Sequence, residues 1–349
     1  MGSLLGLVLH AVGGFAAGSF YIPIKQVREW AWESSWFVLA LSAWLVVPMV
    51  FAALSVPALG EVLSGTSSQT LFITYGFGVL WGVGGLTFGL ALRYLGISLG
   101  MAVALGLTAA FGTLVPPLYE GTFGSLLAST SGQTILFGVV LCLVGIGICG
   151  YAGVLKDRHV GQVKRAVEDE DISDEFSLRK GIIVALVAGL LSACFAFGLA
   201  AGAPIAERAI SSGAKPLFQN NAILVVILLG GLTSNLLYTI TLNMRNGTWR
   251  DYTTSEKPRL RNSAWSALGG LTWYLQFFFY GMGETFLGEQ FSFASWSIHM
   301  AFIILFSTLW GIYFLEWKEA GKAAHRSLAM GLAILVLSTV LIGVGGSLG

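Results

Sequence analysis

The most regular feature of the chain is a succession of long apolar stretches separated by shorter polar ones. Each stretch is close to the roughly 20 residues that a helix needs to cross a bilayer. Apolar residues run on continuously instead of alternating with polar ones, which argues against membrane-spanning strands. The stretches lie at residues 4–24, 34–56, 71–93, 97–118, 134–155, 180–203, 218–243, 263–283, 290–315 and 327–347. This pattern predicts an all-α membrane protein with ten transmembrane helices.

Composition agrees with this fold class, since 55% of the 349 residues are hydrophobic, 11% are charged, and the mean hydropathy is +0.78. A soluble domain carries about 25% charged residues. The net charge of +1 gives no reason to expect a nucleic acid as partner. Cys142, Cys149 and Cys194 all lie in apolar stretches, so they predict neither a disulfide framework nor a metal site. The first stretch lacks a basic leader, and no cleavable signal is expected.

Lysine and arginine are distributed unevenly between the two sides of the predicted bundle. All but Arg208 and Lys215 of the 19 basic residues lie in or beside the connections that follow the first, third, fifth, seventh and ninth stretches. Cytoplasmic loops of membrane proteins carry the excess of basic residues. We therefore expect those connections to be cytoplasmic and both chain termini to face outward.

The longest polar interruption, residues 156–179, divides the chain into two halves, 1–155 and 180–349. Each half contains five predicted spans. The interruption includes the acidic run Glu168-Asp169-Glu170-Asp171. We interpret the whole segment as a solvated cytoplasmic linker, with a regulatory site in the acidic run as the alternative.

A short sequence match relates the two halves. The third span contains Gly84-Gly85-Leu86-Thr87, and the eighth contains Gly269-Gly270-Leu271-Thr272, at corresponding positions of their halves. Because five is odd, two five-helix repeats would insert with opposite topology, as in many secondary transporters. The sequence therefore predicts two inverted five-helix repeats, with chance similarity of two glycine-rich helices as the alternative.

Four polar side chains lie well inside predicted spans, where they are costly and therefore functional candidates. They are His10 in the first span, Thr108 in the fourth, Gln276 in the eighth and His299 in the ninth. At about 1.5 Å per residue, the depths from the outer helix ends are roughly 9 Å for His10, 11 Å for Gln276 and 14 Å for His299. Both halves thus contribute hydrogen-bonding groups at a similar depth, although the distances between them do not follow from the sequence.

Aromatic residues accompany these polar groups at helical spacing. Trp273 and Tyr280 share a helix face with Gln276, and Trp296 shares one with His299. Aromatic rings can cover the apolar C–H faces of a sugar, while amides and imidazoles bond its hydroxyl groups. The candidate sugar contacts are therefore Gln276, Trp273, Tyr280, His10, Trp296 and Thr108. The alternative is that the polar groups hydrogen-bond across helices and only hold the bundle together.

An imidazole titrates near neutral pH, so either His10 or His299 can carry a coupling proton. Glu33, at the start of the second span, is a third candidate and can also form an ion pair with Lys25 across the short first connection. Other carboxylates lie near span ends and are interpreted as solvated interface residues, namely Glu120, Glu284 and Glu289. The sequence does not rank the proton carriers.

Catalytic motifs are absent from the sequence, which has no HExxH, nucleophile elbow or P-loop. Gly82-Val83-Gly84 lies inside a span and not after a strand. We therefore expect no enzymatic activity, no metal and no cofactor. Any uphill transport would be driven by an ion gradient.

Several short blocks of sequence are characteristic, and they follow one another from the first span to the last connection. They are Phe20-Tyr21-Ile22-Pro23-Ile24-Lys25, Trp30-Ala31-Trp32-Glu33, Arg93-Tyr94-Leu95-Gly96, Trp273-Tyr274-Leu275-Gln276-Phe277-Phe278-Phe279-Tyr280, Ser295-Trp296, His299-Met300, Glu316-Trp317 and Ala320-Gly321. Together these blocks resemble the bacterial L-rhamnose–proton symporter family, and the block around Gln276 is the most specific. The interiors of the fourth and seventh spans and the turn 283–288 depart from the family pattern.

This resemblance implies the fold of the drug/metabolite transporter superfamily, in which ten helices form two inverted five-helix repeats. It also implies a symporter that imports L-rhamnose, a 6-deoxyhexose, with a proton across the bacterial inner membrane, so that both termini would be periplasmic. A related monosaccharide is an alternative substrate because of the departures. Two alternative functions stay open, a metabolite or drug exporter on the same fold and a membrane sugar sensor that binds without transport.

Overall fold

The structure is a computed structural model that describes residues 2–95, 97–119, 121–167, 178–254, 258–287 and 293–348. Throughout this part of the chain the regular secondary structure is helical. The α-helices are α1 (Gly2–Ser19), α2 (Tyr21–Ile24), α3 (Trp32–Leu41), α4 (Val47–Ser55), α5 (Leu59–Ser64), α6 (Ser68–Leu95), α7 (Ile97–Tyr119), α8 (Phe123–Ala128), α9 (Thr130–Val167), α10 (Leu178–Ala201), α11 (Ala203–Ser211), α12 (Asn220–Asn246), α13 (Arg250–Thr253), α14 (Arg259–Leu287), α15 (Phe293–Tyr313) and α16 (Gly321–Leu348). A π-helical turn, η1 (Ser42–Val46), joins α3 to α4, and a 3-10 turn, η2 (Pro216–Phe218), precedes α12.

The helices confirm a multi-pass membrane protein. Within the described residues, 8 helices or runs of helices are long and apolar enough to cross a bilayer. The predicted fourth span falls on α7, whose apolar part, Val103–Leu118, is shorter than these. The predicted eighth span falls on α14, which begins with the polar sequence Arg259-Leu260-Arg261-Asn262 and is not among the 8. The count of ten spans therefore stays a prediction.

Helix α9 extends well beyond the apolar stretch that predicted it. The sequence predicts its end near residue 155, whereas α9 continues to Val167, into the segment interpreted as a linker. A helix satisfies its backbone hydrogen bonds internally in water as well as in lipid, so hydropathy marks where a span ends and not where its helix ends. The acidic run 168–171, Glu120 and Glu289 lie outside the described residues.

The chain folds into two compact units. The first unit comprises Met1–Gly14, Gly84–Ala193 and Phe286–Gly349, and the second comprises Phe15–Val83 and Cys194–Thr285. Helices α1, α6, α10 and α14 contribute residues to both units. Each unit thus combines segments from both halves of the sequence.

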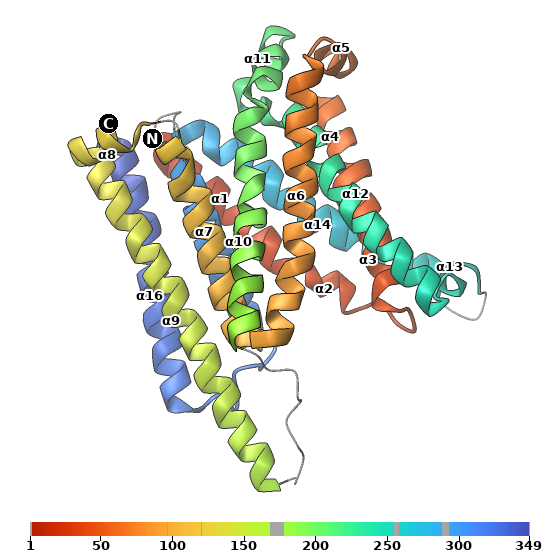
Figure 1. Cartoon of the computed structure of the whole chain (residues 1–349), viewed down its shortest axis with the longest axis vertical. Coiled ribbons are helices and arrows are strands. Elements are labelled where there is room, and N and C mark those ends of the chain that lie inside the picture. Colours follow the sequence, from red (N-terminus) through yellow and green to blue (C-terminus); the bar gives the residue numbers. More distant parts are fainter. Residues whose placement is uncertain are drawn as a thin grey trace. The chain divides into compact units, whose positions relative to one another are not determined.

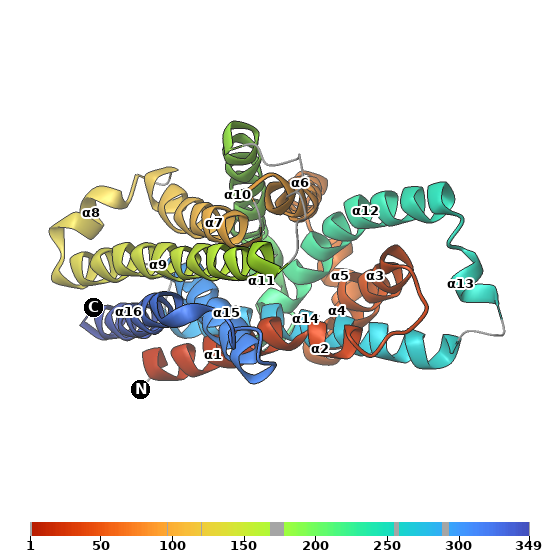
Figure 2. The same cartoon turned by 90° about the horizontal axis from the view of Figure 1, so that it is seen from below.

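In the first unit, α9 and α16 lie side by side along much of their length (Figure 1; Figure 2). Glycines allow this close approach, since a Cβ atom at Gly138 would lie 2.7 Å from Cγ1 of Ile342. Similarly, a Cβ atom at Gly145 would lie 2.9 Å from Cγ of Leu335. Helices α7 and α15 pack against each other and against α9. This packing holds the helices that carry Thr108 and His299.

In the second unit, α12 packs against α3, η1 and α4. A hydrogen bond of 2.7 Å from Asn221 Nδ2 to Ser55 Oγ joins α12 to the end of α4. Helix α6 reaches α12 through a second polar contact, in which the hydroxyl groups of Tyr75 and Thr233 lie 2.7 Å apart. Helices α3, α4 and α12 thus pack around the π-helical turn, which carries Trp44.

Candidate functional site

Two of the predicted polar residues meet inside the first unit. His10 of α1 and His299 of α15 have ring centroids 6.2 Å apart, with an angle of 58° between the ring planes. Neither side chain has any exposed surface. The structure thus brings together two imidazoles from opposite ends of the chain, a contact that the sequence did not predict.

Trp296 links this histidine pair to α7. It lies one turn before His299 on α15, and the two ring centroids are 6.4 Å apart. The indole Nε1 of Trp296 donates a hydrogen bond of 3.1 Å to the backbone carbonyl of Thr108. Gly112 faces the same indole, because a Cβ atom there would lie 2.5 Å from Cδ1 of Trp296. We call His10, His299, Trp296 and Thr108 the histidine cluster.

Within this cluster the side chain of Thr108 is directed to its own helix. Its hydroxyl group donates to the carbonyl of Ala104 over 2.8 Å, so its contribution to the cluster is its backbone carbonyl. The hydroxyl group of Ser295 lies one turn before His299, is fully buried, and has no hydrogen-bond partner among the described residues. Because a buried hydroxyl usually finds a partner, Ser295 adds an available polar group to this region.

Two imidazoles at this distance disfavour the binding of two protons. At an effective dielectric constant of about 20, two unit charges roughly 6 Å apart repel by about 3 kcal/mol. A doubly protonated pair is therefore disfavoured by about a hundredfold relative to separated groups. Repulsion therefore limits the histidine pair to at most one proton.

A second group of predicted residues lies in the second unit, in a cluster of aromatic rings. Trp273 of α14 packs its ring against Trp44 of η1, with centroids 5.0 Å apart, and against Trp81 of α6 at 5.7 Å. Phe277 lies 4.8 Å from Trp273, and Phe195 of α10 lies 4.4 Å from Phe277. We call Trp44, Trp81, Trp273, Phe277 and Phe195 the aromatic cluster. Tyr280 borders it, with its ring 6.2 Å from that of Phe195.

Trp44 is the notable member of this cluster because its indole N–H is buried and has no acceptor among the described residues. Trp36, by contrast, donates its N–H to Asn235 Oδ1 over 3.2 Å. Trp44 also lies in a π-helical turn, and such turns occur frequently at functional sites. An unsatisfied buried donor costs about 1–3 kcal/mol, so a ligand or water that accepts from it would be favoured.

Gln276, the predicted amide inside a span, is 6% exposed. Its Nε2 donates a hydrogen bond of 2.9 Å to the backbone carbonyl of Trp273, one turn earlier on α14. This contact fixes the direction of the amide beside the aromatic cluster and satisfies one of its two N–H groups. The remaining N–H and the carbonyl oxygen are the groups that can bond a hydroxyl.

Glu33, the third predicted proton carrier, belongs to the second unit, whereas the histidine cluster belongs to the first. Its Oε1 accepts hydrogen bonds from Asn246 Nδ2 at 2.8 Å and from Thr248 Oγ1 at 3.1 Å. Both donors are neutral, and they come from the end of α12 and the loop after it. The ion pair between Glu33 and Lys25 stays a prediction.

A buried polar network surrounds Glu33, and the sequence analysis missed it. Asp251 is 3% exposed, and its Oδ2 accepts from Ser34 Oγ at 2.7 Å and from the backbone N–H of Ala31 at 2.8 Å. Tyr252 donates its hydroxyl to the carbonyl of Ser34 over 3.2 Å. Burial raises the pKa of Tyr252 to about 12, and the nearby carboxylates of Asp251 and Glu33 act in the same direction. The network joins the first connection to the segment after α12.

The structure thus sorts the predicted sugar contacts and the two histidines into two groups. It brings His10, His299, Trp296 and Thr108 together in the first unit. It places Trp273, Gln276 and Tyr280 in or beside the aromatic cluster of the second unit. Trp44 and Trp81 were not predicted, because the polar candidates inside spans were histidine, glutamine and threonine and did not include the indole N–H of tryptophan. An indole N–H in a span is a polar group as well, and that signal identifies Trp44.

Known proteins are similar to this chain over nearly its whole length. The family model for the L-rhamnose-proton symport protein matches residues 2–347. The L-rhamnose-proton symporter of Mannheimia succiniciproducens is 36% identical over 345 residues, which cover 98% of this chain and 98% of the relative. That of Cronobacter sakazakii is 36% identical over 344 residues, covering 98% and 97%. That of Yersinia pestis is 35% identical over 345 residues, covering 98% of each.

Proposed function

Because the chain belongs to the L-rhamnose-proton symport family, we propose that it imports L-rhamnose together with a proton across the bacterial inner membrane by alternating access. The observation that carries the proposal is the similarity to L-rhamnose-proton symporters over 98% of the chain. The family is one of transporters, so no residue is assigned a catalytic role. Energy comes from the proton gradient, without a cofactor.

We assign the proton to the histidine pair. His10 and His299 are buried and adjacent, and their mutual repulsion limits the pair to at most one proton. Protonation from outside would favour sugar binding, and the loaded carrier would then open inward and release both. Glu33 is the second candidate, since its carboxylate is held by neutral donors and has no cation to compensate its charge among its hydrogen-bond partners.

We assign sugar recognition first to the aromatic cluster. Trp273 offers a ring face for the apolar C–H groups of a 6-deoxyhexose, and Gln276 offers an amide for its hydroxyl groups. The unsatisfied indole N–H of Trp44 adds a donor to the same cluster. Tyr280, His10, Trp296 and Thr108 remain proposed sugar contacts from the sequence.

The finer features of the fold are part of this proposal. Every one of the ten apolar stretches coincides with described helical segments, which supports ten spans, and the Gly-Gly-Leu-Thr match supports two inverted repeats. The basic connections support cytoplasmic loops on their side, with both termini in the periplasm.

The proposal is tested by counterflow in proteoliposomes that contain the purified full-length chain. The panel is L-rhamnose, L-fucose, L-mannose, L-lyxose and D-glucose, each with and without an inwardly directed proton gradient. We expect counterflow with L-rhamnose, accumulation only with the gradient, and alkalinisation of the medium when the sugar is added outside. D-Glucose serves as the unrelated sugar.

The other outcomes identify the alternative functions. Binding of L-rhamnose without counterflow would indicate a sugar sensor. Absence of sugar-induced alkalinisation, together with outward movement of other compounds, would indicate an exporter. Failure of every sugar in the panel would overturn the proposal.

A further inference from the structure

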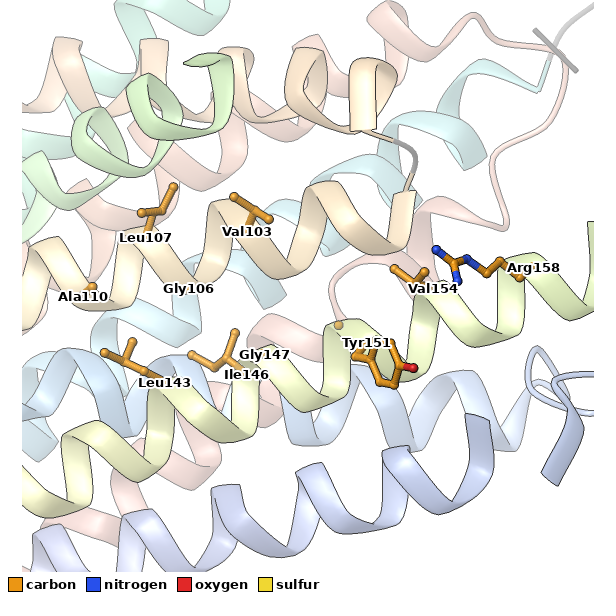
Figure 3. Close-up of a pocket in the computed structure, with 11 residues that line it drawn as sticks. Val103, Gly106, Leu107, Ala110, Leu143, Ile146, Gly147, Tyr151, Val154 and Arg158 are labelled. Atoms are coloured by element: carbon orange, nitrogen blue, oxygen red, sulfur yellow. The ribbon is translucent and has the colours of Figure 1, made fainter. Parts of the chain in front are cut away.

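A groove between α7 and α9 in the first unit has no role in the proposed transport mechanism (Figure 3). Its volume is about 600 Å³, and its lining is apolar apart from one end. Small residues on both helices, Gly106 on α7 and Gly147 on α9, open the space between them. Leu143 and Ile146 of α9 are directed toward α7 and form part of its wall (Figure 3).

The apolar part of this groove has the length of one lipid leaflet. Between Leu143 and Val154, both of which line the groove, α9 rises about 16 Å at roughly 1.5 Å per residue. Half of the hydrocarbon core of a bilayer is about 15 Å thick. A single acyl chain of a phospholipid therefore matches the groove in length and in apolar character.

The polar end of the groove is formed by Arg158. This residue lies at the end of the candidate span Thr130–His159, where a helix that crosses a bilayer leaves its hydrocarbon core. Its side chain is exposed, and its guanidinium group lies back beside Val154, over the end of the groove (Figure 3). Within the described part of the chain, no carboxylate pairs with this guanidinium group.

We propose that this groove binds one anionic phospholipid, with an acyl chain between α7 and α9 and the phosphate on Arg158. A guanidinium group binds a phosphate through two parallel hydrogen bonds, which gives geometric selectivity as well as charge. Basic pockets between transmembrane helices recognise the headgroups of anionic lipids in this way. A net negative headgroup adds to the attraction, whereas the choline of a zwitterionic lipid opposes it.

The structure allows the two halves of the site to be tested separately. Arg158→Gln removes the charge at the polar end and leaves the groove intact. Gly147→Leu fills the apolar part, and it is compatible with the local packing because a Cβ atom at Gly147 has nothing within 4 Å. Arg245→Gln, at an exposed position in the last turn of α12, is the matched charge control. Gly76→Leu, at a glycine with equally open surroundings on α6, is the matched control for added volume.

The experiment is native mass spectrometry of the purified full-length chain, titrated with palmitoyl-oleoyl phosphatidylglycerol or with the matched phosphatidylcholine. We expect the wild type to prefer the phosphatidylglycerol by about tenfold, which is the effect of one charged hydrogen-bonded contact. Arg158→Gln should reduce the preference to about twofold or less, and Gly147→Leu should weaken the binding of both lipids. Both control variants should behave as the wild type.

Two results would overturn the proposal. One is an unchanged preference in Arg158→Gln together with unchanged lipid binding in Gly147→Leu. The other is a wild-type dimer that Gly147→Leu converts to a monomer without a change in bound lipid, which would make the groove an interface between copies of the chain. Because mass is the readout, neither result depends on whether the protein transports L-rhamnose.

Discussion

His10 and His299 place their imidazole rings 6.2 Å apart, centroid to centroid, although they come from opposite ends of the chain. Both are fully buried, and Trp296 holds His299 against α7 through its hydrogen bond to the carbonyl of Thr108. Buried imidazoles in contact form a unit that accepts one proton more readily than two. For a proton-coupled transporter, this relationship makes α1 and α15 the helices through which protonation would act.

Replacement of His299 by asparagine should uncouple transport from the proton gradient. Asparagine keeps a hydrogen-bonding side chain but does not titrate, so gradient-driven accumulation of L-rhamnose should fall by about tenfold or more. Counterflow at equal pH should stay within about twofold of the wild type. His325→Asn is the control, because His325 is exposed on α16. Full gradient-driven accumulation by His299→Asn would assign the proton to another group.

Replacement of Gln276 by alanine should reduce L-rhamnose uptake while the protein stays folded in detergent. Loss of one hydrogen bond to a sugar hydroxyl is worth about 1 kcal/mol, or roughly fivefold in apparent affinity. Gln133→Ala is the matched control, since Gln133 also donates its amide to a backbone carbonyl but is exposed. Uptake by Gln276→Ala at the level of the wild type would assign Gln276 to packing.

Replacement of Trp44 by phenylalanine should raise the KM for L-rhamnose by about fivefold. An aromatic ring is kept, but the pyrrole part of the indole is lost together with its buried N–H, which has no acceptor among the described residues. Removal of an unsatisfied buried donor is neutral or stabilising, whereas loss of a donor to the sugar weakens binding. Trp249→Phe, at a position that is 39% exposed, is the control. An unchanged KM would remove Trp44 from the sugar site.

Replacement of Ser34 by alanine should destabilise the protein. Ser34 Oγ donates to Asp251 Oδ2 over 2.7 Å, and both residues are buried, so the variant leaves a buried carboxylate with one donor fewer. The expected cost is about 1–3 kcal/mol, measured as a lower thermal midpoint in detergent. Ser211→Ala, which removes an exposed hydroxyl that bonds its own helix, should leave the midpoint unchanged. Equal midpoints for the two variants would show that the network contributes little to stability.

Stability should also fall at high pH because of Tyr252. Burial raises its pKa to about 12 from the ordinary value of 10.0, so the folded protein favours the neutral phenol more than the unfolded chain does. The resulting stabilisation is fully present below pH 10 and is lost as the pH rises from about 10 to about 12. The measurement is the thermal midpoint against pH, and Tyr252→Phe should show a smaller decline over this window. An identical decline in the two proteins would contradict the assignment.

Local hydropathy was sufficient to predict an all-helical membrane protein. A segment that crosses lipid must be apolar over about 20 residues and must satisfy its own backbone hydrogen bonds. A continuous run of apolar residues therefore indicates where such a segment lies. Each predicted stretch accordingly coincides with described helices, and the family blocks around Gln276 and His299 led to the family that the full-length comparison confirms. The same criterion misjudged the end of α9, because helix formation in water does not require apolar residues.

Contacts between distant segments depended on the packed structure. His10 meets His299, Trp44 meets Trp273, and Glu33 accepts a hydrogen bond from Asn246. Helical periodicity shows which residues share a face, but it does not show which helix that face will pack against or how far along it. That choice depends on side-chain volumes and close glycine contacts summed over whole interfaces, as between α9 and α16. The sequence could therefore name the histidines and the glutamine, whereas only their packing revealed a histidine pair and an indole N–H beside the aromatic cluster.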